Sequence, residues 1–437
     1  MPRWFAAPFA LCLSLAAAST SAAQLTPLEQ AVVASVRSEN PRALALLKET
    51  VDINSGTMNF AGVRRVGEVM DREFRDIGMR TEWIDGSGFQ RAGHLVAHHD
   101  GAPGSPKVLL IGHLDTVFAK DSPFQALQLT GPKAGSGPGV NDMKGGNVIL
   151  LQALRALKAN GQLDRLSVRV VLTGDEEDSG KPTALSKQAL LEAGDWADVA
   201  IGFENADGRP ENAAVSRRGA SGWQLQVTGQ PAHSSQIFQP EVGAGAIYEA
   251  ARILEAFRDR LSGFENLSFN PGVIVGGTDV ALDHEDSRGS AFGKDNVVAQ
   301  KVLVDGDLRA VSREQLEAAR AIMREVLAQP LPGTSATIRF DDGYPPMAPT
   351  AGNLRLLELY DAASRDLGQG PVGKVHPRKA GAADISFVAD RVDMAIDGLG
   401  LKGPGNHTVD EIADLDTLES QTLRAALLLH RLPEALR

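Results

Sequence analysis

The chain has 437 residues, of which 43% are hydrophobic and 23% are charged, and its formal net charge at pH 7 is −11. A chain of this length exceeds the size at which one hydrophobic core keeps growing, so we expect two domains. The negative net charge argues against a nucleic-acid partner, which would require a basic face.

The first 23 residues have the pattern of a secretory signal peptide. Arg3 precedes an apolar stretch, which ends in the small residues Ser21-Ala22-Ala23, so cleavage is expected after Ala23. We therefore expect a protein secreted to the periplasm or the extracellular space, with no membrane segment after cleavage. The only cysteine, Cys12, would leave with this peptide. Any metal site of the mature chain is then built from histidine and carboxylate side chains, without thiolates.

A buried strand at 108–111 introduces the first candidate site. Helices are predicted over about 24–47 and 63–78, and strands at 80–84, 93–97 and 108–111. The last strand stops at Gly112-His113-Leu114-Asp115, and open α/β sheets bind ligands at the carboxyl ends of such strands. His113 and Asp115 leave the backbone on the same side, as when a carboxylate orients a metal-ligating imidazole. A polar pair at a strand end explains this stretch equally well.

Acidic residues follow two further predicted elements. A glycine-rich loop at 135–146 carries Asp142 just before a helix at 148–157, so this residue is either a ligand or a helix cap. The apolar strand 166–172 ends at Asp175-Glu176-Glu177-Asp178. Four consecutive acids repel one another unless cations neutralise them, although a solvated turn is the simpler alternative.

The pattern recurs twice more. Strand 197–203 ends at Glu204, and a strand predicted at Met394–Leu401 leads to the stretch Gly403–His407 and a last helix at 415–430. This repetition favours a metal site over separate structural explanations. The set suits two zinc ions, with Asp142 expected to bridge them, and consists of His113, Asp142, Glu177, Glu204 and His407.

Residues 221–340 are predicted to form an inserted domain. Trp223, Leu225 and Val227 alternate as in a half-buried strand, and two long helical stretches accompany such strands. This order favours helices on one face of a small antiparallel sheet. The ligand-bearing strands resume only afterwards, so the catalytic domain is expected at 24–220 and 341–437.

Six stretches, in this order and spacing, resemble the di-zinc peptidase and aminoacylase superfamily, and within it the bacterial glutamate carboxypeptidases of the carboxypeptidase G type. They read G-H-L-D-T-V, G-P-G-V-N-D-M-K-G-G-N, T-G-D-E-E, G-F-E-N, G-Q-P-A-H-S and G-N-H. The resemblance covers essentially the whole mature chain. It implies an α/β catalytic domain, with a mixed, largely parallel sheet sandwiched by helices, plus an inserted α+β lid and dimerisation domain.

The resemblance also implies roles for individual residues. His113 and Glu204 would bind one zinc ion, Glu177 and His407 the other, and Asp142 both. Glu176 matches the general base and Asp115 the carboxylate that orients His113. In the insert, Arg309 and Asn296 match substrate contacts, and His233 matches a residue that reaches the active site of the partner in a homodimer. Without the resemblance, His233 reads as a solvated loop histidine and Arg309 as half of a surface ion pair.

The expected reaction is hydrolysis of an amide bond by a zinc-bridging water, which releases a C-terminal amino acid, with glutamate expected, from small peptides or N-acyl amino acids. An aminoacylase or dipeptidase of other specificity is the alternative enzyme. A periplasmic binding protein is the alternative of another class, but it would have no use for a base such as Glu176 beside the ligands.

The sequence departs from the family pattern at four places. Met143 and Asn205 replace an aspartate and a proline, and the stretch 380–384 reads A-G-A-A-D. The loop 276–293 is longer than usual, and no role is assigned to its residues Asp279, Asp283, His284, Glu285 and Asp286. These departures leave the ligand set intact and bear on the substrate.

Overall fold

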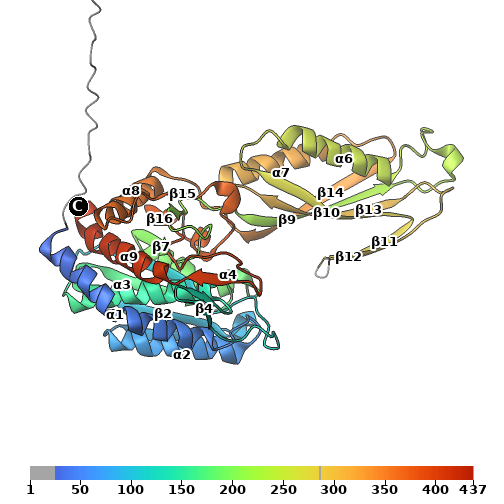
Figure 1. Cartoon of the computed structure of the whole chain (residues 1–437). Coiled ribbons are helices and arrows are strands. Elements are labelled where there is room, and N and C mark those ends of the chain that lie inside the picture. The colour runs from blue at the N-terminus through green and yellow to red at the C-terminus, as the bar shows by residue number, and fades with distance from the viewer. Residues whose placement is uncertain (1–24, 285–286, 437) are drawn as a thin grey trace, which may run out of the picture.

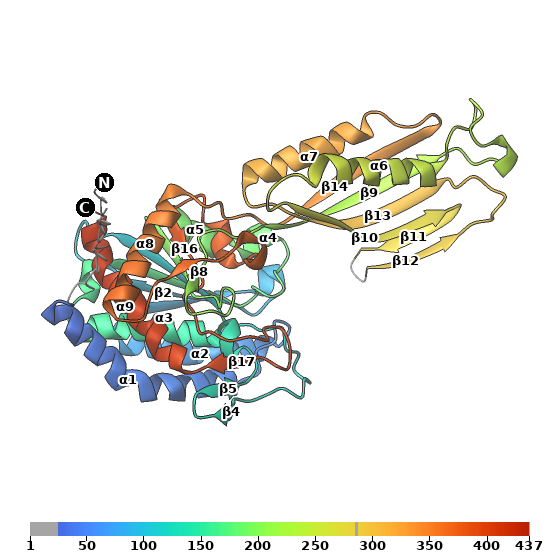
Figure 2. The ribbon, with the colours of Figure 1, turned by 45° about the horizontal axis from the view of Figure 1, so that its top comes forward.

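The structure is a computed structural model that describes residues 25–284 and 287–436 and consists of two lobes (Figure 1). The predicted signal peptide, residues 1–23, lies outside the described residues. Over the described part of the chain, no helix is long and apolar enough to cross a membrane. The larger lobe holds both ends of the described chain, and the smaller lobe extends away from it (Figure 2).

The larger lobe is built on a six-stranded mixed sheet. Its strands lie in the order β1 (Arg80–Asp85), β2 (Gly93–His99), β6 (Ser167–Thr173), β3 (Lys107–His113), β7 (Val199–Gly202) and β16 (Met394–Ile396). The first two strands are antiparallel to their neighbours, whereas the last four run parallel to one another. The predicted largely parallel sheet is thus confirmed, and its four parallel strands end at one common edge.

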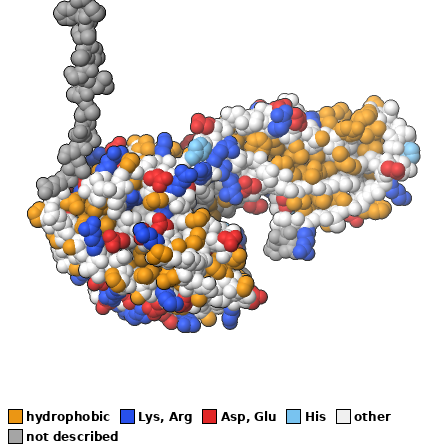
Figure 3. Space-filling view, in the orientation of Figure 1, with side chains coloured by type: hydrophobic (Ala, Val, Ile, Leu, Met, Phe, Trp, Pro, Cys, Tyr) orange, Lys and Arg blue, Asp and Glu red, His pale blue; other side chains and the backbone are white. Residues whose placement is uncertain are grey.

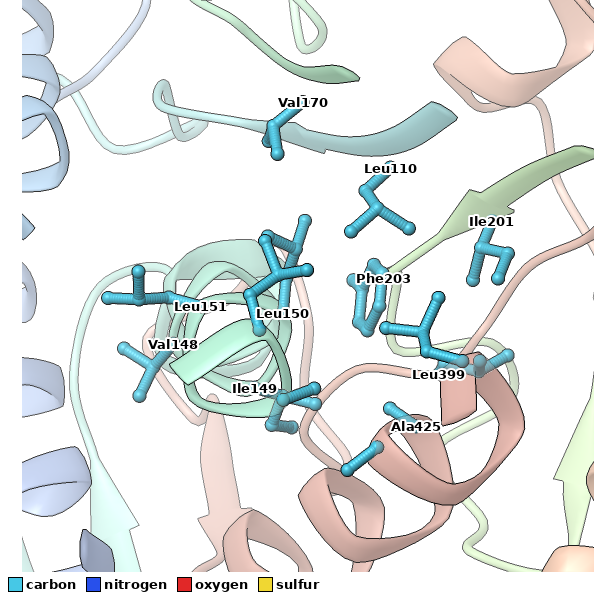
Figure 4. Packing of buried hydrophobic residues seen from close by; sticks show 14 of the residues in the cluster. Leu110, Val148, Ile149, Leu150, Leu151, Val170, Ile201, Phe203, Leu399 and Ala425 are labelled. Carbon is cyan, nitrogen blue, oxygen red and sulfur yellow. The ribbon is translucent and has the colours of Figure 1, made fainter. Parts of the chain in front are cut away.

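Helices cover both faces of this sheet. One face packs against α1 (Pro27–Val51), α2 (Phe60–Asp76), α3 (Gly145–Ala159), α8 (Ala351–Asp366) and α9 (Asp416–Ala435), and the other against α5 (Gln188–Trp196) and residues 384–389. Alternate residues of β3 serve the two layers, with Leu110 on the first face and Leu109 on the second. Because α3 lies between the sheet and α9, its residues 148–151 are buried on all sides (Figure 4).

The last strand of the sheet is shorter than predicted. We expected a strand over Met394–Leu401, but β16 ends at Ile396. The side chain of Asp397 accepts hydrogen bonds from the backbone N–H groups of Gly398 and Glu204, and Gly398 adopts a left-handed conformation with φ of +82°. The apolar run therefore continues as a buried loop, and His407 is delivered by this loop rather than by a strand end.

Short elements complete the larger lobe. Three strands, β4 (Gln128–Gly131), β5 (Ala134–Ser136) and β17 (Ile412–Asp414), form a small sheet, and β8 (Asn212–Ala213) pairs with β15 (Gly373–Lys374). A short helix, α4 (Thr183–Ser186), precedes α5.

The smaller lobe is an α+β layer, as predicted. Its antiparallel sheet has the order β10 (Ser268–Gly277), β13 (Lys301–Arg309), β9 (Ala220–Gly229) and β14 (Thr334–Tyr344), and α6 (Ala246–Leu261) and α7 (Arg313–Leu327) pack on one face. Trp223, Leu225 and Val227 point into this second core. The long loop 276–293 contains the antiparallel pair of β11 (Asp279–Asp283) and β12 (Arg288–Phe292). Residues 285–286, which come between these strands in the sequence, lie outside the described residues.

The chain enters and leaves the smaller lobe side by side. The backbones of Arg217 and Met347 form a pair of reciprocal hydrogen bonds, each of 3.0 Å, just before β9 and just after β14. Arg217 is buried and its Nε donates to Asp397 at 2.8 Å. The junction is thus anchored to the sheet of the larger lobe.

Candidate metal centre

The predicted metal ligands converge at the carboxyl edge of the parallel strands. His113 is the last residue of β3, Glu177 follows the end of β6, and Glu204 follows the end of β7. Asp142 comes from the turn before α3, and His407 from the loop between β16 and β17. Because β3, β6 and β7 are in parallel register, their ends and the residues that follow meet at one place.

Asp142 lies between two groups, each of one histidine and one glutamate. Its Oδ1 is 3.1 Å from His113 Nε2, and its Oδ2 is 3.0 Å from His407 Nε2. His113 Nε2 is also 3.3 Å from Glu204 Oε1, and His407 Nε2 is 3.3 Å from Glu177 Oε2. In each group of three, one ligand atom per residue lies within 4.8 Å of the others. Two groups that share one carboxylate are the arrangement expected of a dinuclear metal centre.

A buried turn presents Asp142 and a distant glutamate holds that turn. Within residues 140–144, Asp142 and Met143 have non-helical backbone angles. No side chain caps α3 at Lys144, so the helix-cap interpretation of Asp142 is wrong. The carboxylate of Glu411 accepts the backbone N–H groups of Gly139, Asn141 and Asp142 at 2.9, 2.8 and 3.1 Å. Glu411 is fully buried and lies on the same loop as His407. The loop between β16 and β17 therefore supplies the ligand candidate His407 and, through Glu411, also fixes the turn that carries Asp142.

Asp115 links three parts of the site. Its Oδ2 accepts a hydrogen bond of 2.6 Å from the Thr57 hydroxyl, and its two oxygens accept the backbone N–H groups of Glu176 and Glu177 at 3.1 and 3.2 Å. His113 Nδ1 is 3.0 Å from the backbone carbonyl of Asp115 and 3.4 Å from its carboxylate. The ring of His113 therefore contacts both the backbone carbonyl and the carboxylate of Asp115, and the carbonyl is the nearer of the two. This contact leaves Nε2 of His113 for a metal ion.

The crowded carboxyl groups of this cluster fit bound cations. Burial first, and then the charges of Asp142 and Glu176, raise the pKa of Glu177 to about 11. Burial also raises the pKa of Glu204 and of Glu176. Glu177 Oε1 is buried without a hydrogen-bond partner among the described residues. Carboxylates that cannot all ionise next to one another, and an unpartnered oxygen among them, fit a pair of divalent ions.

The four consecutive acids have four different environments. Asp175 is fully buried and pairs with the equally buried Lys187 at 2.9 Å. Asp178 is more than half exposed and pairs with Arg91 at 2.7 Å. The solvated-turn interpretation therefore fits Asp178 alone. Glu176 and Glu177, between them, are the two that face the metal groups.

The surroundings of Glu176 were missed by sequence reasoning. Lys187 Nζ lies 3.1 Å from Asp384 Oδ1, and the hydroxyl of Tyr344, at the end of β14, donates to the backbone carbonyl of Glu176 at 2.7 Å. Among the causes of the shifted pKa of Glu176, His113 lowers it, whereas Glu204, Asp384 and Asp142 raise it. Asp384 ends the stretch that departs from the family pattern, but nothing in the sequence pairs it with Lys187.

The predicted residues of the insert lie apart from this cluster. His233 follows the far end of β9, whose ten residues span about 30 Å at roughly 3.3 Å each, and its Nδ1 contacts Ser235 at 2.9 Å. Asn296 is exposed. Arg309 ends β13 near the junction, and its Nε donates to Asp307 at 3.0 Å. In the described single chain, the contacts of these three residues do not include a metal-ligand candidate.

Comparison with known proteins agrees with this geometry. A sequence profile of peptidase family M20/M25/M40 matches residues 109–431. Carboxypeptidase G2 of Pseudomonas sp. (strain RS-16) is 26% identical over 394 residues, which cover 90% of this chain and 89% of that protein. Succinyl-diaminopimelate desuccinylase of Rhodopseudomonas palustris (strain TIE-1) is 25% identical over 331 residues, which cover 72% of this chain and 80% of that protein.

Solved structures share the two-lobed fold. Aminopeptidase PepT of Bacillus cereus superposes with a TM-score of 0.69 at 20% identity, covering 90% of this chain and 98% of that one. A dinuclear metal-binding peptidase of the M20 family from Bacillus subtilis gives a TM-score of 0.61 at 14% identity, and the superposition covers 91% of this chain and 99% of that one. At these identities the likeness concerns the fold. With the profile match over most of its length, the chain belongs to peptidase family M20/M25/M40 and is a metal-dependent peptidase or amidohydrolase.

Proposed function

We propose that the protein is a dinuclear zinc carboxypeptidase that releases a C-terminal amino acid, with glutamate as the expected residue, from N-acyl or peptidyl substrates. The observation that carries the proposal is the sharing of Asp142 by two histidine–glutamate groups, with Glu176 beside them. The likeness to carboxypeptidase G2 over most of both chains supports the glutamate specificity.

The spacing of the ligand atoms supports zinc. Two ligands about 2.0–2.1 Å from a tetrahedral ion lie roughly 3.3 Å from each other. The four imidazole–carboxylate separations in the two groups are 3.0, 3.1, 3.3 and 3.3 Å. The donor set of imidazole nitrogens and carboxylate oxygens, without thiolates, also suits this ion.

In the proposed mechanism, Glu176 is the general base and Glu177 a ligand. When bound, two zinc ions would supply Lewis-acid chemistry, lowering the pKa of a water and polarising the substrate carbonyl. Glu176 accepts the proton of the attacking water and passes it to the leaving amine, which needs a carboxylate close to both. Asp115 and Tyr344 hold the backbone of Glu176 from two sides, so its carboxylate keeps a fixed position.

A free carboxylate on the substrate is supported by the charges near the junction. Arg218 lies near two other arginines, Arg309 and Arg378. Burial, and then the like charges of these two residues, lower the pKa of Arg218. Among the described residues, Arg309 forms an ion pair with Asp307, whose side chain is 42% exposed. A cluster of guanidinium groups suits a substrate carboxylate, because the planar fork of arginine binds it with two hydrogen bonds.

A substrate panel tests the proposal. Purified protein without residues 1–23, loaded with zinc, is assayed against N-acyl amino acids and dipeptides with varied C-terminal residues. We expect the highest kcat/KM for a C-terminal glutamate with a free carboxylate. Preference for another C-terminal residue would show an aminoacylase or dipeptidase of other specificity, and metal binding without hydrolysis would favour a binding protein.

We also propose a homodimer formed by the smaller lobe, in which His233 serves the partner's site. Hydrophobic side chains gather on the visible face of this lobe (Figure 3). The large apolar side chains that the lobe exposes include Phe238, Ile247, Tyr248, Ile274 and Phe292. Monomeric proteins rarely leave such groups uncovered. The distance of His233 from the ligands of its own chain also supports this arrangement.

Subunit mixing tests the role of His233. Glu176→Gln and His233→Ala homodimers should each be nearly inactive. After random exchange, half of the dimers are mixed, and one of the two sites in each combines an intact Glu176 with an intact His233 of the other chain. We expect recovery of about a quarter of wild-type activity. No recovery despite demonstrated exchange would place His233 outside the partner's site.

A further inference from the structure

One lysine of the larger lobe is enclosed among charged groups behind the proposed base. Lys187 is the single residue between α4 and α5, and it is only 1% exposed. Its Nζ lies 2.9 Å from Asp175 Oδ1 and 3.1 Å from Asp384 Oδ1, and it donates to the backbone carbonyl of Asp175 at 3.3 Å. These contacts use the three donors of the ammonium group. With so little exposure, Lys187 acts on a reaction only through the residues that it contacts.

The first of these contacts leads to the bend that carries the base. We call residues 174–180, which follow β6 and include Glu176, the base bend. Asp175 Oδ2 accepts a hydrogen bond from the backbone N–H of Gly180 at 2.8 Å, so this carboxylate joins the two ends of the base bend. The other oxygen of Asp175 is the one that Lys187 holds. The lysine therefore fixes the residue that directly precedes the base.

A buried histidine fastens the start of the base bend to the same place. Nδ1 of His94 accepts the backbone N–H of Gly174 at 3.1 Å, so the ring proton lies on Nε2, which donates to the Ser186 carbonyl at 2.7 Å. Burial lowers the pKa of His94, which favours this neutral form. Because Ser186 directly precedes Lys187, the histidine connects the base bend to the turn that carries the lysine.

Asp384 extends the contacts of Lys187 to the last strand of the smaller lobe. Oδ2 of Asp384 accepts from the hydroxyl of Thr173 at the end of β6, and Oδ1 lies 3.4 Å from the hydroxyl of Tyr344. Tyr344, the last residue of β14, donates this hydroxyl to the backbone carbonyl of Glu176 at 2.7 Å. The ring of Tyr344 is centred 5.6 Å from Lys187 Nζ, within the range of a cation–π contact. Lys187 thus reaches the backbone of the base by two routes.

The location of this buried charge is more informative than its effect on stability. Burial acts against the charge of Lys187, but the charges of Asp384 and Asp175 raise its pKa above the usual value. Well-packed apolar side chains often stabilise a fold as much as a buried ion pair does. A charged group adds hydrogen bonds of defined direction to several partners at once. Here those partners are the neighbours of Glu176.

We infer that Lys187 is a positioning residue for Glu176: through Asp175 and Asp384 it holds the base bend, and with it the carboxylate of the base, in one place. The inference rests on the proposed function and adds a residue to it. General-base catalysis requires a fixed distance between the base and the proton that it accepts. Because the partners of Lys187 are these two aspartates rather than ligand candidates, its loss should act on kcat and leave KM and zinc content unchanged.

The variant Lys187→Met tests the inference in zinc-loaded protein with the amide that wild type cleaves best. We expect kcat to fall about 10²-fold, as for a misplacement of roughly 1 Å, with the same KM, zinc content and spectrum of the cobalt form. Lys187→Arg, which keeps the charge and the donors, should recover most of this loss. In a Glu176→Gln background, Lys187→Met should cause little further loss, because the lysine acts through the base.

Two further variants separate positioning from stability. Arg155→Met is the matched control, because Arg155 and Glu73 form another buried ion pair, of 2.8 Å, between α3 and α2. This variant should lower the midpoint of thermal unfolding and leave kcat unchanged. Asp384→Asn decides the question if Lys187→Met does not fold. It keeps the shape of the side chain, removes one of the charges that Lys187 holds, and should lower kcat with unchanged KM and zinc content.

Three results would overturn the inference. An unchanged kcat per zinc-loaded site in Lys187→Met, with only a lower unfolding midpoint, would show that the lysine serves stability alone. Loss of zinc along with kcat would show that it supports the ligand Glu177 rather than the base. An equal further loss in the Glu176→Gln background would show an effect that does not pass through Glu176. If zinc-loaded wild type hydrolyses no amide of the panel, the proposed function itself fails, which is a different outcome.

Discussion

The two lobes hold their charged residues in opposite ways. In the larger lobe, His113, Asp115 and Glu411 are nearly fully buried, and each has at least one hydrogen-bond partner that fixes its position. In the smaller lobe, the side chains of His233 and Arg309 hydrogen-bond to near neighbours in the chain, Ser235 and Asp307. The larger lobe is therefore organised for chemistry before a substrate arrives. Under the proposed dimer, the smaller lobe would offer groups that complete the site of the partner chain.

The sharpest test of this difference is removal of metal. Chelation should abolish activity, and zinc or cobalt should restore it, because the proposed mechanism needs two divalent ions. About two ions per chain are expected by metal analysis of carefully prepared protein. Full activity in metal-free protein would contradict the role of the larger lobe as a dinuclear centre.

The next largest effect is expected within the adjacent pair Glu176 and Glu177. Glu176→Gln should lower kcat by about 10² or more with unchanged zinc content, because the base is lost and the ligands remain. Glu177→Gln is the matched control and should lose metal. Kinetic measurements together with metal analysis distinguish loss of the base from loss of a ligand. If Glu176→Gln lost metal and Glu177→Gln kept it, the roles assigned to the two glutamates would be reversed.

A smaller effect is expected at Glu411, which touches the turn of Asp142 but is not in either metal group. Glu411→Gln should weaken zinc affinity by about 10- to 100-fold, as for other groups that hold a ligand in place. Competition with a chromophoric chelator measures the affinity, and the d–d spectrum of the cobalt form reports ligand geometry. Glu419→Gln, on the exposed side of α9, should change neither measurement. An unaltered affinity in Glu411→Gln would show that the turn keeps its shape without this carboxylate.

The smallest effect is expected in the smaller lobe. Arg309→Ala should raise KM for substrates with a free C-terminal carboxylate about tenfold or more, and zinc content should stay the same. The same variant should not affect substrates whose terminal carboxylate is amidated. An equal rise in KM for both kinds of substrate would show that Arg309 does not bind the terminal carboxylate. It would also weaken the proposal that the smaller lobe contributes to substrate binding.

The sequence predicted the convergence of the ligand candidates because three of them, His113, Glu177 and Glu204, lie at or just after the end of a strongly patterned strand. Apolar strands with a histidine or acid at the carboxyl end are a local signal, and parallel strands bring such ends together. Glu411 and Lys187 were missed because their roles depend on pairing between distant parts of the chain. Glu411 binds a turn about 270 residues earlier, and Lys187 reaches Asp384, so no local pattern distinguishes them from surface charges.

The end of β16 shows a second limit of local patterns. The run from Met394 to Leu401 is as apolar as a strand, but it continues as a buried loop where the Asp397 carboxylate takes over the backbone N–H groups. The acids after β6 show a third limit. Their sequence is uniform, and only packing decides that Asp175 is neutralised by Lys187 while Glu177 faces the metal groups.

The paired entry and exit of the smaller lobe make it an exchangeable module. Because Arg217 and Met347 already lie side by side, a linker of a few residues between them closes the chain of the larger lobe without moving its sheet. Gene segments that encode different insert lobes can then be recombined at this point while the metal centre is kept. Such an exchange would replace the groups of the smaller lobe and leave the ligand-bearing strands of the larger lobe in place.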